Sequence, residues 1–321
     1  MTSAPDSPAR VPVGLPVVAV VGATASGKTA LSLDLAEAFT AAGTPGEVLN
    51  TDAMQLYRGM DVGTAKLPPA ERRGVVHHLL DVLDVTEPAS VAEFQAWARG
   101  LVADLRGRGR VPVLVGGSAL YTRAVLDEFE FPGTDPALRE RLEAELAQVG
   151  SGALHARLAA VDPAAAASIL PENGRRIVRA LEVVELTGRS FTATLPRLEY
   201  ALPGAVQVGV DIDRPTLDAR IEQRVEQMFA DGFVDEVERL LGEGLAEGRT
   251  AGRAIGYREV ADHLAGVLSL EEAKERTVVA TRRFARRQDS WFRKDPRITW
   301  VRFDDPDRLT RALAAVRAAT A

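Results

Sequence analysis

The residues of this chain best suited to chemistry form a glycine-rich loop near its start. Residues 22–29 read Gly-Ala-Thr-Ala-Ser-Gly-Lys-Thr and fit the pattern G-x-x-x-x-G-K-[ST]. In such a loop the backbone N–H groups surround an anion, the lysine adds a mobile cation, and the last hydroxyl can bind magnesium. The sequence therefore predicts a phosphate site, with magnesium held through Thr29, made of Gly22, Ala23, Thr24, Ala25, Ser26, Gly27, Lys28 and Thr29.

The motif leaves open which phosphate compound binds. A nucleotide triphosphatase needs a second acidic residue at the end of an apolar strand to hold magnesium. The apolar run at 111–115 is instead followed by Gly116-Gly117-Ser118. The loop could therefore hold a diphosphate that leaves as a whole. Asp81 and Asp84 remain rival magnesium ligands, and a turn or cap role is at least as compatible with either residue.

A second chemical candidate is the carboxylate of Asp52, at the end of the expected strand 47–52. In an open α/β sheet, ligands collect beyond the carboxyl ends of the strands, so Asp52 is expected to face the phosphate loop. A carboxylate there could orient or deprotonate a nucleophile. An aspartate that caps a helix or a turn explains the same position equally well.

Buried strands alternating with amphipathic helices must position these residues. The run Val17–Val21 is apolar and β-branched, as in a parallel sheet, and helical spacing of apolar residues follows it from Lys28 to Thr40. This alternation predicts an α/β fold, a P-loop doubly wound parallel sheet. The remaining strands are expected at 47–52, 111–115, 206–212 and 298–303, and helices at 90–108, 118–126, 215–230 and 234–241, with one or two more between 256 and 293 and a short one at the end.

The segment 132–198 has helical patterns without strands, broken by Pro, Gly and Asn. We therefore predict a flexible tail at 1–15, a P-loop core at 16–131 and 199–321, and an inserted all-helical subdomain at 132–198.

Composition excludes several classes of site. Among 321 residues there is no cysteine, which excludes disulfides, thiolate zinc sites, iron–sulfur clusters and cysteine nucleophiles. No secretory leader and no run of 18 apolar residues is found, so no membrane contact and a cytoplasmic location are expected. The pair His77-His78 is a weak metal candidate, since adjacent side chains point to different faces.

The net charge of −6 argues at first against nucleic-acid binding. The segment 276–297, however, has eight basic residues against two acidic ones. Phe284, Trp291 and Phe292 lie among them and could stack on bases beside phosphate contacts. An amphipathic helix that packs its aromatics inward is the alternative, and both are expected to hold in part.

Several blocks of this sequence, in order, resemble those of the bacterial tRNA dimethylallyltransferases. They are the phosphate loop 22–29, DAMQLYRGMDVGTAK at 52–66, GGSALY at 116–121, RRIVRALEV at 175–183, IGY at 255–257, TRR at 281–283 and RQ at 287–288. The similarity runs from about Val17 to Trp300, nearly the whole chain.

The resemblance implies transfer of the dimethylallyl group from dimethylallyl diphosphate to the exocyclic amine of the adenosine immediately 3′ of the anticodon of tRNA, with magnesium. It makes Asp52 the general base, and it places Thr24 and Arg224 on the diphosphate held by the loop. The insert would clamp the anticodon stem-loop, and a monomer is expected. The implied tRNA-binding residues are Asp52, Ala53, Met54, Gln55, Ser118, Arg139, Arg175, Arg176, Arg179, Arg253 and Tyr257.

The chain departs from the family pattern at three positions. Ala23 stands where proline is common, Ser118 where threonine is common, and Ala53 where serine is common. Ala53 puts one hydrogen bond to the substrate in doubt. Three other functions remain as alternatives: a dimethylallyltransferase that acts on free adenylate, a P-loop kinase or ATPase, and a non-catalytic RNA-binding protein.

Overall fold

The computed structural model describes residues 14–194 and 197–320 and divides into two compact units. One unit comprises the residues up to Leu126 together with those from Tyr200 onward, and the other comprises Asp127–Glu199. The tail expected at 1–15 lies, except for its last two residues, outside the described part. The helical segment expected at 132–198 falls within the second unit.

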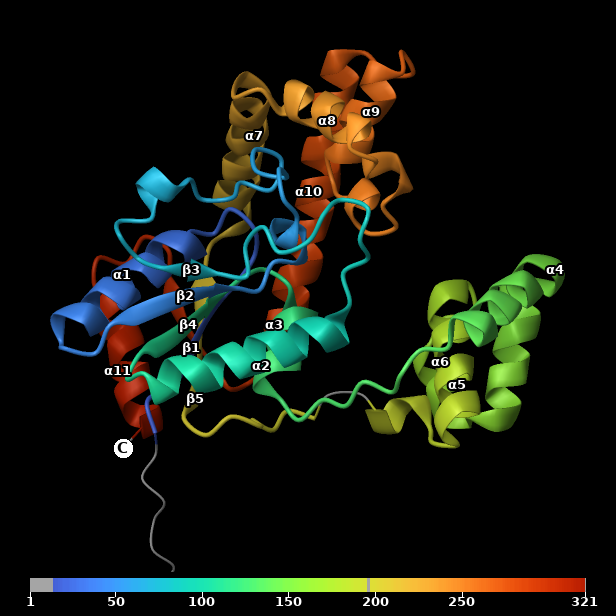
Figure 1. The fold of residues 1–321 in the computed structure, drawn as a ribbon, viewed down its shortest axis with the longest axis horizontal. Coiled ribbons are helices and arrows are strands. Elements are labelled where there is room, and N and C mark those ends of the chain that lie inside the picture. The colour runs from blue at the N-terminus through green and yellow to red at the C-terminus, as the bar shows by residue number, and fades with distance from the viewer. Residues whose placement is uncertain (1–13, 195–196, 321) are drawn as a thin grey trace, which may run out of the picture. The chain divides into compact units, whose positions relative to one another are not determined.

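The first unit is built on a parallel sheet (Figure 1), which confirms the predicted doubly wound α/β class. Its order in the described residues is β3-β2-β4-β1-β5-β6. The central strand β1 pairs with β4 through Val18 and Val113, and with β5 through Val18 and Val206. The strands are β1 (Val17–Val21), β2 (Gly46–Asn50), β3 (His77–His78), β4 (Val111–Val115), β5 (Ala205–Asp211) and β6 (Ile298–Arg302).

Successive residues of β1 face opposite sides of the sheet, and each side has its own apolar cluster. Val18 and Val20 belong to the cluster that packs on α1 (Lys28–Ala41) and α11 (Arg308–Thr320). Val17, Ala19 and Val21 belong to the cluster of α2 (Val91–Gly107) and α3 (Ala119–Leu126). Because helices cover both faces, every residue of β1 is buried, as its unbroken apolar run predicts.

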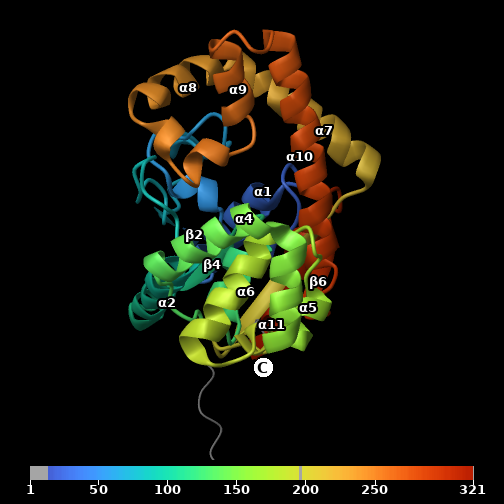
Figure 2. The same ribbon diagram turned by 90° about the vertical axis from the view of Figure 1, so that its right-hand side faces the viewer.

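The remaining helices of this unit stand together at one end of the sheet, and both views show them as a group (Figures 1 and 2). They are α7 (Arg214–Ala230), α8 (Phe233–Gly242), α9 (Tyr257–Leu264) and α10 (Leu270–Phe292). Short 3-10 turns join other parts of the unit, at Ala53–Leu56, Pro69–Glu71, Leu245–Glu247 and Ala251–Arg253.

The second unit is all-helical in its described residues. It contains α4 (Pro136–Val161), α5 (Pro163–Ser168) and α6 (Gly174–Thr187), followed by a 3-10 turn at Phe191–Thr194. α4 is kinked at Gly150 (φ 78°, ψ 165°), a conformation that glycine adopts readily. Helical structure therefore continues on both sides of Gly150, with only this kink between the two parts.

Two strand predictions need correction. The second strand ends at Asn50 rather than at residue 52, because Asp52 turns out of the sheet to begin a 3-10 helix. The edge strand β3 was not predicted, since a pair of histidines has no apolar pattern. No helix among the described residues has the length and apolar character needed to cross a membrane.

Candidate active site

The predicted phosphate loop lies between β1 and α1, as its motif requires. Gly22 and Gly27 have φ angles of 140° and 102°, which residues with a side chain rarely adopt. A Cβ on Gly22 would also approach the Val210 carbonyl oxygen to 3.1 Å. The glycines are therefore required by the path of the backbone, and their spacing curls the loop around the start of α1.

Three cations from two helices converge on this loop. The ammonium of Lys28 donates to the Ala23 carbonyl at 2.6 Å. Arg224 of α7 donates to the Thr24 hydroxyl at 3.3 Å, which joins the two predicted diphosphate contacts. Arg220, one helical turn before Arg224, donates to the Ala25 carbonyl at 3.4 Å. Arg220 was not predicted as a site residue, although it lies four residues before Arg224 and therefore on the same helix face.

The electrostatics of this cluster favour an anion. Burial, together with the charge of Arg224, lowers the pKa of Lys28 to about 7, and Asp52 only partly opposes this. Burial and the neighbouring Arg220 likewise lower the pKa of Arg224. The buried hydroxyl of Ser26 has no hydrogen-bond partner among the described residues. A bound diphosphate would stabilise the cations and offer an acceptor to this hydroxyl.

Asp52 is both a turn cap and a site carboxylate, so the two sequence interpretations are compatible. Its Oδ1 accepts from the Met54 N–H at 3.0 Å and thereby caps the 3-10 helix Ala53–Leu56. Burial raises the pKa of Asp52, while the Met54 N–H bond and the charge of Lys28 act in the opposite direction. Its proton affinity is therefore higher than that of an exposed aspartate, as a general base at neutral pH needs.

A cavity of about 330 Å³ brings half of the predicted site residues of the first unit together. The predicted residues on its wall are Thr24, Asp52, Ala53, Met54, Ser118, Arg224, Arg253 and Tyr257. Phe284, a predicted candidate for base stacking, also lies on this wall. The wall residues that were not predicted are Gly63, Thr64, Val225, Met228, Ala254, Ile255, Thr277 and Thr281. The apolar part of this wall suits a hydrocarbon group, and the polar part suits a base and a phosphate.

Two predicted tRNA contacts have their polar groups engaged within the protein. Tyr257 is 1% exposed, and its hydroxyl donates to Glu236 at 2.6 Å. The side-chain amide of Gln55 donates to the Thr64 carbonyl at 3.0 Å, and Gln55 is not on the cavity wall. Their contact with tRNA stays a prediction. Gln55 bonds residue 64 directly, whereas Tyr257 bonds Glu236, which accepts from the N–H groups of residues 61–63.

Gln288 is a site residue whose role the sequence did not show. Its Oε1 accepts from the Thr24 N–H and its amide donates to the Gly117 carbonyl, both at 2.8 Å. It is 5% exposed. Gln288 thereby joins the phosphate loop to the loop after β4, and the RQ block was the only sequence signal for it.

The predicted arginines of the second unit fall into two groups. Arg139 and Arg179 both pair with Glu182, whose side chain is fully buried. Arg179 also donates to the Pro132 carbonyl at 2.7 Å. Arg175 is exposed, whereas Arg176 lies 5.9 Å from the centre of the Phe191 ring. Because Arg179 turns toward Glu182, the three arginines Arg175, Arg176 and Arg179 do not form one exposed basic face, and their contact with tRNA stays a prediction.

Among the described residues, Thr29 is the candidate ligand for magnesium. No group of three or more His, Asp or Glu side chains that could hold a metal occurs among the described residues. The exposed Thr29 hydroxyl, on the first turn of α1, remains as a ligand that would share the ion with phosphate oxygens and water. The rival acids are engaged elsewhere, Asp81 with Lys66 and Asp84 with Arg58.

The histidine pair does not form a metal site in this structure. His78 pairs with Glu47 at 2.7 Å, whereas the ring of His77 contacts the Val75 carbonyl at 2.9 Å.

Comparison with known proteins agrees with this geometry. The family model described as IPP transferase matches residues 55–295. A tRNA dimethylallyltransferase of Nocardioides sp. is 73% identical over 310 residues, which cover 97% of this chain and 98% of that protein. A tRNA dimethylallyltransferase of Streptomyces coelicolor is 57% identical over 308 residues, which cover 96% and 95% of the two chains.

Solved structures give the same result. A tRNA isopentenylpyrophosphate transferase of Bacillus halodurans is 38% identical, with a TM-score of 0.68 over 95% of this chain and 98% of that chain. A eukaryotic dimethylallyltransferase acting on tRNA is 25% identical, with a TM-score of 0.77 over 91% and 74%. The chain therefore belongs to the IPP transferase family, the family of the tRNA dimethylallyltransferases.

Proposed function

We propose that this chain transfers the dimethylallyl group of dimethylallyl diphosphate to the exocyclic amine of the adenosine immediately 3′ of the anticodon of tRNA, with Asp52 as the general base. One observation carries the assignment of residues. A single cavity is lined by Asp52, a carboxylate of raised pKa, and by Thr24 and Arg224 of the phosphate site. An acceptor amine beside Asp52 and a donor diphosphate beside Thr24 would therefore share one enclosed space.

The reaction needs one proton acceptor and one site for developing negative charge. The amine nitrogen attacks the carbon that bears the diphosphate, and the C–O bond breaks with its electron pair on the diphosphate. The amine proton passes to the Asp52 carboxylate. An aromatic amine is a poor nucleophile, so removing its proton as the new bond forms is the help it requires.

The leaving diphosphate is stabilised by cations that are in place beforehand. Lys28, Arg220 and Arg224 surround the loop, and Arg224 contacts the Thr24 hydroxyl. Preorganised positive groups of this kind are commonly the largest single contribution to catalysis. Thr29 would hold magnesium here, and the ion would supply further neutralisation of the same charge.

The anticodon arm of tRNA is the second substrate of the proposed reaction. We assign the exposed Arg175 of the helical unit and the exposed Arg253 of the cavity wall to its phosphates. The target base must leave the stack to reach Asp52, and this costs less in an unpaired loop than in a duplex. We further propose that the protein is a cytoplasmic monomer and acts on free tRNA.

Prenyl transfer by the purified chain tests the proposal. Incubation with dimethylallyl diphosphate, magnesium and an anticodon stem-loop should release diphosphate, and mass spectrometry of the digested RNA should find one dimethylallyl group on an adenosine. Preferential modification of AMP would instead show an adenylate-directed transferase. ATP hydrolysis or phosphoryl transfer without prenylation would show a kinase or ATPase, and RNA binding without diphosphate release would show a binding protein.

Asp52→Asn isolates the proton acceptor in this assay. Asparagine keeps an Oδ1 that can accept from the Met54 N–H, so the turn should be retained. We expect kcat to fall by about 10²- to 10⁴-fold with the affinity for the stem-loop unchanged. Asp84→Asn, at an exposed aspartate paired with Arg58, is the matched control. Wild-type kcat in Asp52→Asn would remove Asp52 as the base.

A further inference from the structure

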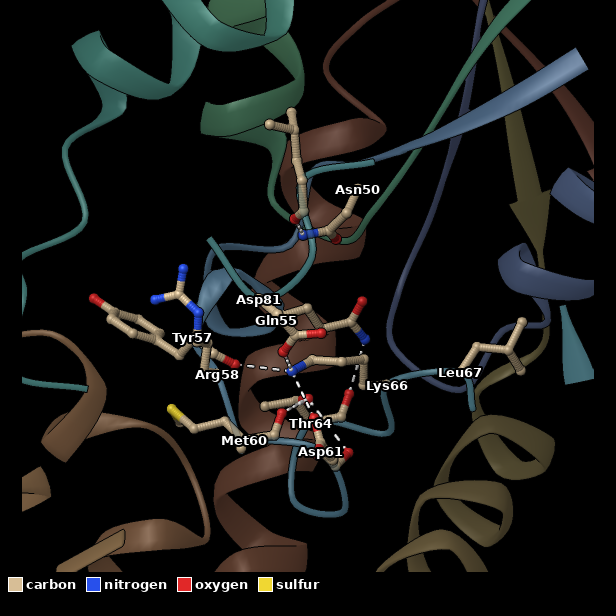
Figure 3. A network of polar contacts seen from close by, with 12 residues as sticks. Asn50, Gln55, Tyr57, Arg58, Met60, Asp61, Thr64, Lys66, Leu67 and Asp81 are labelled. Carbon is tan, nitrogen blue, oxygen red and sulfur yellow. Dashed lines mark hydrogen bonds and ion pairs between the residues drawn. The ribbon is translucent and has the colours of Figure 1, made fainter. Parts of the chain in front are cut away.

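Lys66 is a buried cation whose three N–H donors all have partners. Its ammonium donates to the Tyr57 carbonyl at 2.8 Å and to one carboxylate oxygen each of Asp61 and Asp81 at 2.6 Å. The lysine side chain is 4% exposed. Figure 3 shows the three acceptors gathered around its tip. Burying an ammonium is costly, and removing one partner of a buried ion pair leaves an uncompensated charge.

Two of the three acceptors, Tyr57 and Asp81, belong to segments that hold the turn of Asp52. Tyr57 is the residue at which the 3-10 helix that begins at Asp52 ends. Asp81 lies in a second turn, and the Val82 and Leu83 N–H groups after it both donate to the Leu56 carbonyl, at 2.7 Å and 2.9 Å. The ammonium of Lys66 therefore fastens the far end of the Asp52 turn to the turn of residues 79–83.

Asn50 connects the same second turn directly to Asp52. Its side-chain amide donates to the Leu79 carbonyl and to the Asp52 carbonyl, each at 2.9 Å. Its Oδ1 accepts from the Asp52 N–H at 2.8 Å. The backbone of Asp52 is thus held by Asn50, and Asn50 is bonded in turn to the turn that Lys66 anchors through Asp81.

Backbone strain shows that these turns depend on their contacts. Ala65, Leu79 and Asp81 have φ angles of 50°, 59° and 58°, in the left-handed region that residues other than glycine rarely adopt. This conformation is strained and persists only where the surroundings hold it. The bonds from Lys66 to Asp81 and from Asn50 to Leu79 are contacts of this kind, so without Lys66 the second turn should relax.

We propose that Lys66 is a positioning residue for the reaction: its ammonium locks the turns at 53–57 and 79–83 together and so fixes the place of the Asp52 carboxylate. The inference rests on the proposed role of Asp52 as base. Lys66 does not line the cavity around Asp52. It borders a second cavity of about 700 Å³ together with Arg220 and Arg224, but its three N–H donors are all bonded within the protein, so it acts at a distance. Its effect should therefore appear in the chemical step and not in binding of the donor.

The cations of the donor site lie on elements other than the two turns, so an effect on donor binding can be measured separately from an effect on the chemical step. Lys28 lies on α1, and Arg220 and Arg224 lie on α7, outside the two turns. The titratable groups around Asp52 are Lys28, Tyr121 of α3 and, on the wall of the shared cavity, Arg224, Arg253 and Tyr257, and none of them bonds to the Lys66 ammonium. A change in the pH profile of Lys66 variants would therefore report on the surroundings of Asp52 itself.

The test compares Lys66→Met with Lys274→Met in the full chain. Lys274 also pairs with two carboxylates, Glu226 at 3.5 Å and Glu271 at 3.2 Å, but lies far along the sequence on α10. For Lys66→Met we expect kcat to fall by about 10²-fold, as for a misplaced catalytic group, with the KM for dimethylallyl diphosphate within about twofold of wild type. The fall of kcat on the acidic side of the pH profile should move to lower pH. Without the Lys66 contacts water would reach Asp52, and this would reduce the burial that raises the pKa of Asp52. Lys274→Met should match wild type.

Asp81→Asn decides the question where Lys66→Met does not fold. Asparagine tolerates the left-handed backbone of this position, and the Asp81 side chain is 44% exposed, so the variant should fold. We expect a smaller fall in kcat, about 5- to 10-fold, with the same shift on the acidic side of the pH profile. Wild-type kcat and pH profile in the folded variant, or a donor KM that rises as much as kcat falls, would overturn the proposal. Failure of the proposed function is distinguishable, because the wild-type chain would then release no diphosphate.

Discussion

Binding of dimethylallyl diphosphate should take up a proton at Lys28. Burial and the charge of Arg224 lower the pKa of this ammonium to about 7 in the ligand-free protein. A diphosphate beside it would favour the charged form and move its pKa back toward or above the ordinary value of 10.5. Donor binding and protonation of Lys28 are therefore coupled, and each strengthens the other.

The pH dependence has a definite sign and size. At pH 8, a group with a pKa of about 7 is about nine-tenths neutral, so about 0.9 proton should be taken up for each donor bound. The affinity should fall as the pH rises, since protonation becomes less favourable, and from pH 8 to pH 9 the apparent Kd should rise by about tenfold. Below pH 7 this contribution should level off, because Lys28 is already charged in the free protein.

Calorimetry without tRNA measures the coupling directly, because no turnover occurs. Titrations with dimethylallyl diphosphate at pH 8 and constant magnesium, in HEPES and in Tris, should give different heats, since the buffers have different ionisation enthalpies. Lys28→Arg carries a charge that does not titrate in this range and should show neither proton uptake nor the pH dependence of Kd. Equal heats in both buffers for the wild type, with a Kd unchanged from pH 7 to pH 9, would refute the reasoning.

Two further predictions concern contacts that the structure supplies. Gln288→Ala should lower the free energy of unfolding by about 1–3 kcal/mol in urea titration, because the Thr24 N–H and the Gly117 carbonyl lose their partner, and it should lower kcat through Thr24. A variant as stable as wild type would contradict this. Arg175→Ala should weaken stem-loop binding and reduce its salt slope by about one without changing Tm, whereas Arg179→Ala should lower Tm, because it removes a partner of the buried Glu182. Equal effects of the two substitutions would refute the division of these arginines.

The parts of the site that were predictable from sequence are those fixed by local geometry. The phosphate loop needs only a strand, a glycine-rich turn and a helix, and all three are encoded within residues 17–41. Asp52 follows the same logic, since the end of a parallel strand places it at the ligand edge of the sheet. The resemblance added Arg224, which an amphipathic helix alone would present as a surface residue.

The remaining contacts depend on residues far apart in the sequence. Gln288 reaches the Thr24 N–H across 264 positions, and Glu236 accepts from the Val62 N–H across 174. No periodicity or spacing encodes such pairs. They arise only when α10 packs beside the phosphate loop and α8 packs beside residues 61–63. The partner of Arg179 is an exception: Glu182 lies at i+3 on the same helix, a spacing that predicts an ion pair and that argues against a free basic face.

The net charge of −6 was a poor guide to nucleic-acid binding for a related reason. At physiological ionic strength charges act over about 8 Å, so a phosphate responds to the surface it approaches and not to the sum over the chain. In the described residues α10 exposes four arginines, of which Arg276 interacts with the charge of Glu272 whereas no ion pair is seen for Arg283, Arg286 and Arg287. Its aromatics divide as both sequence interpretations expected, with Phe292 3% and Trp291 52% exposed. The same helix therefore packs one face into the protein and presents a basic, partly aromatic face of the kind that binds RNA.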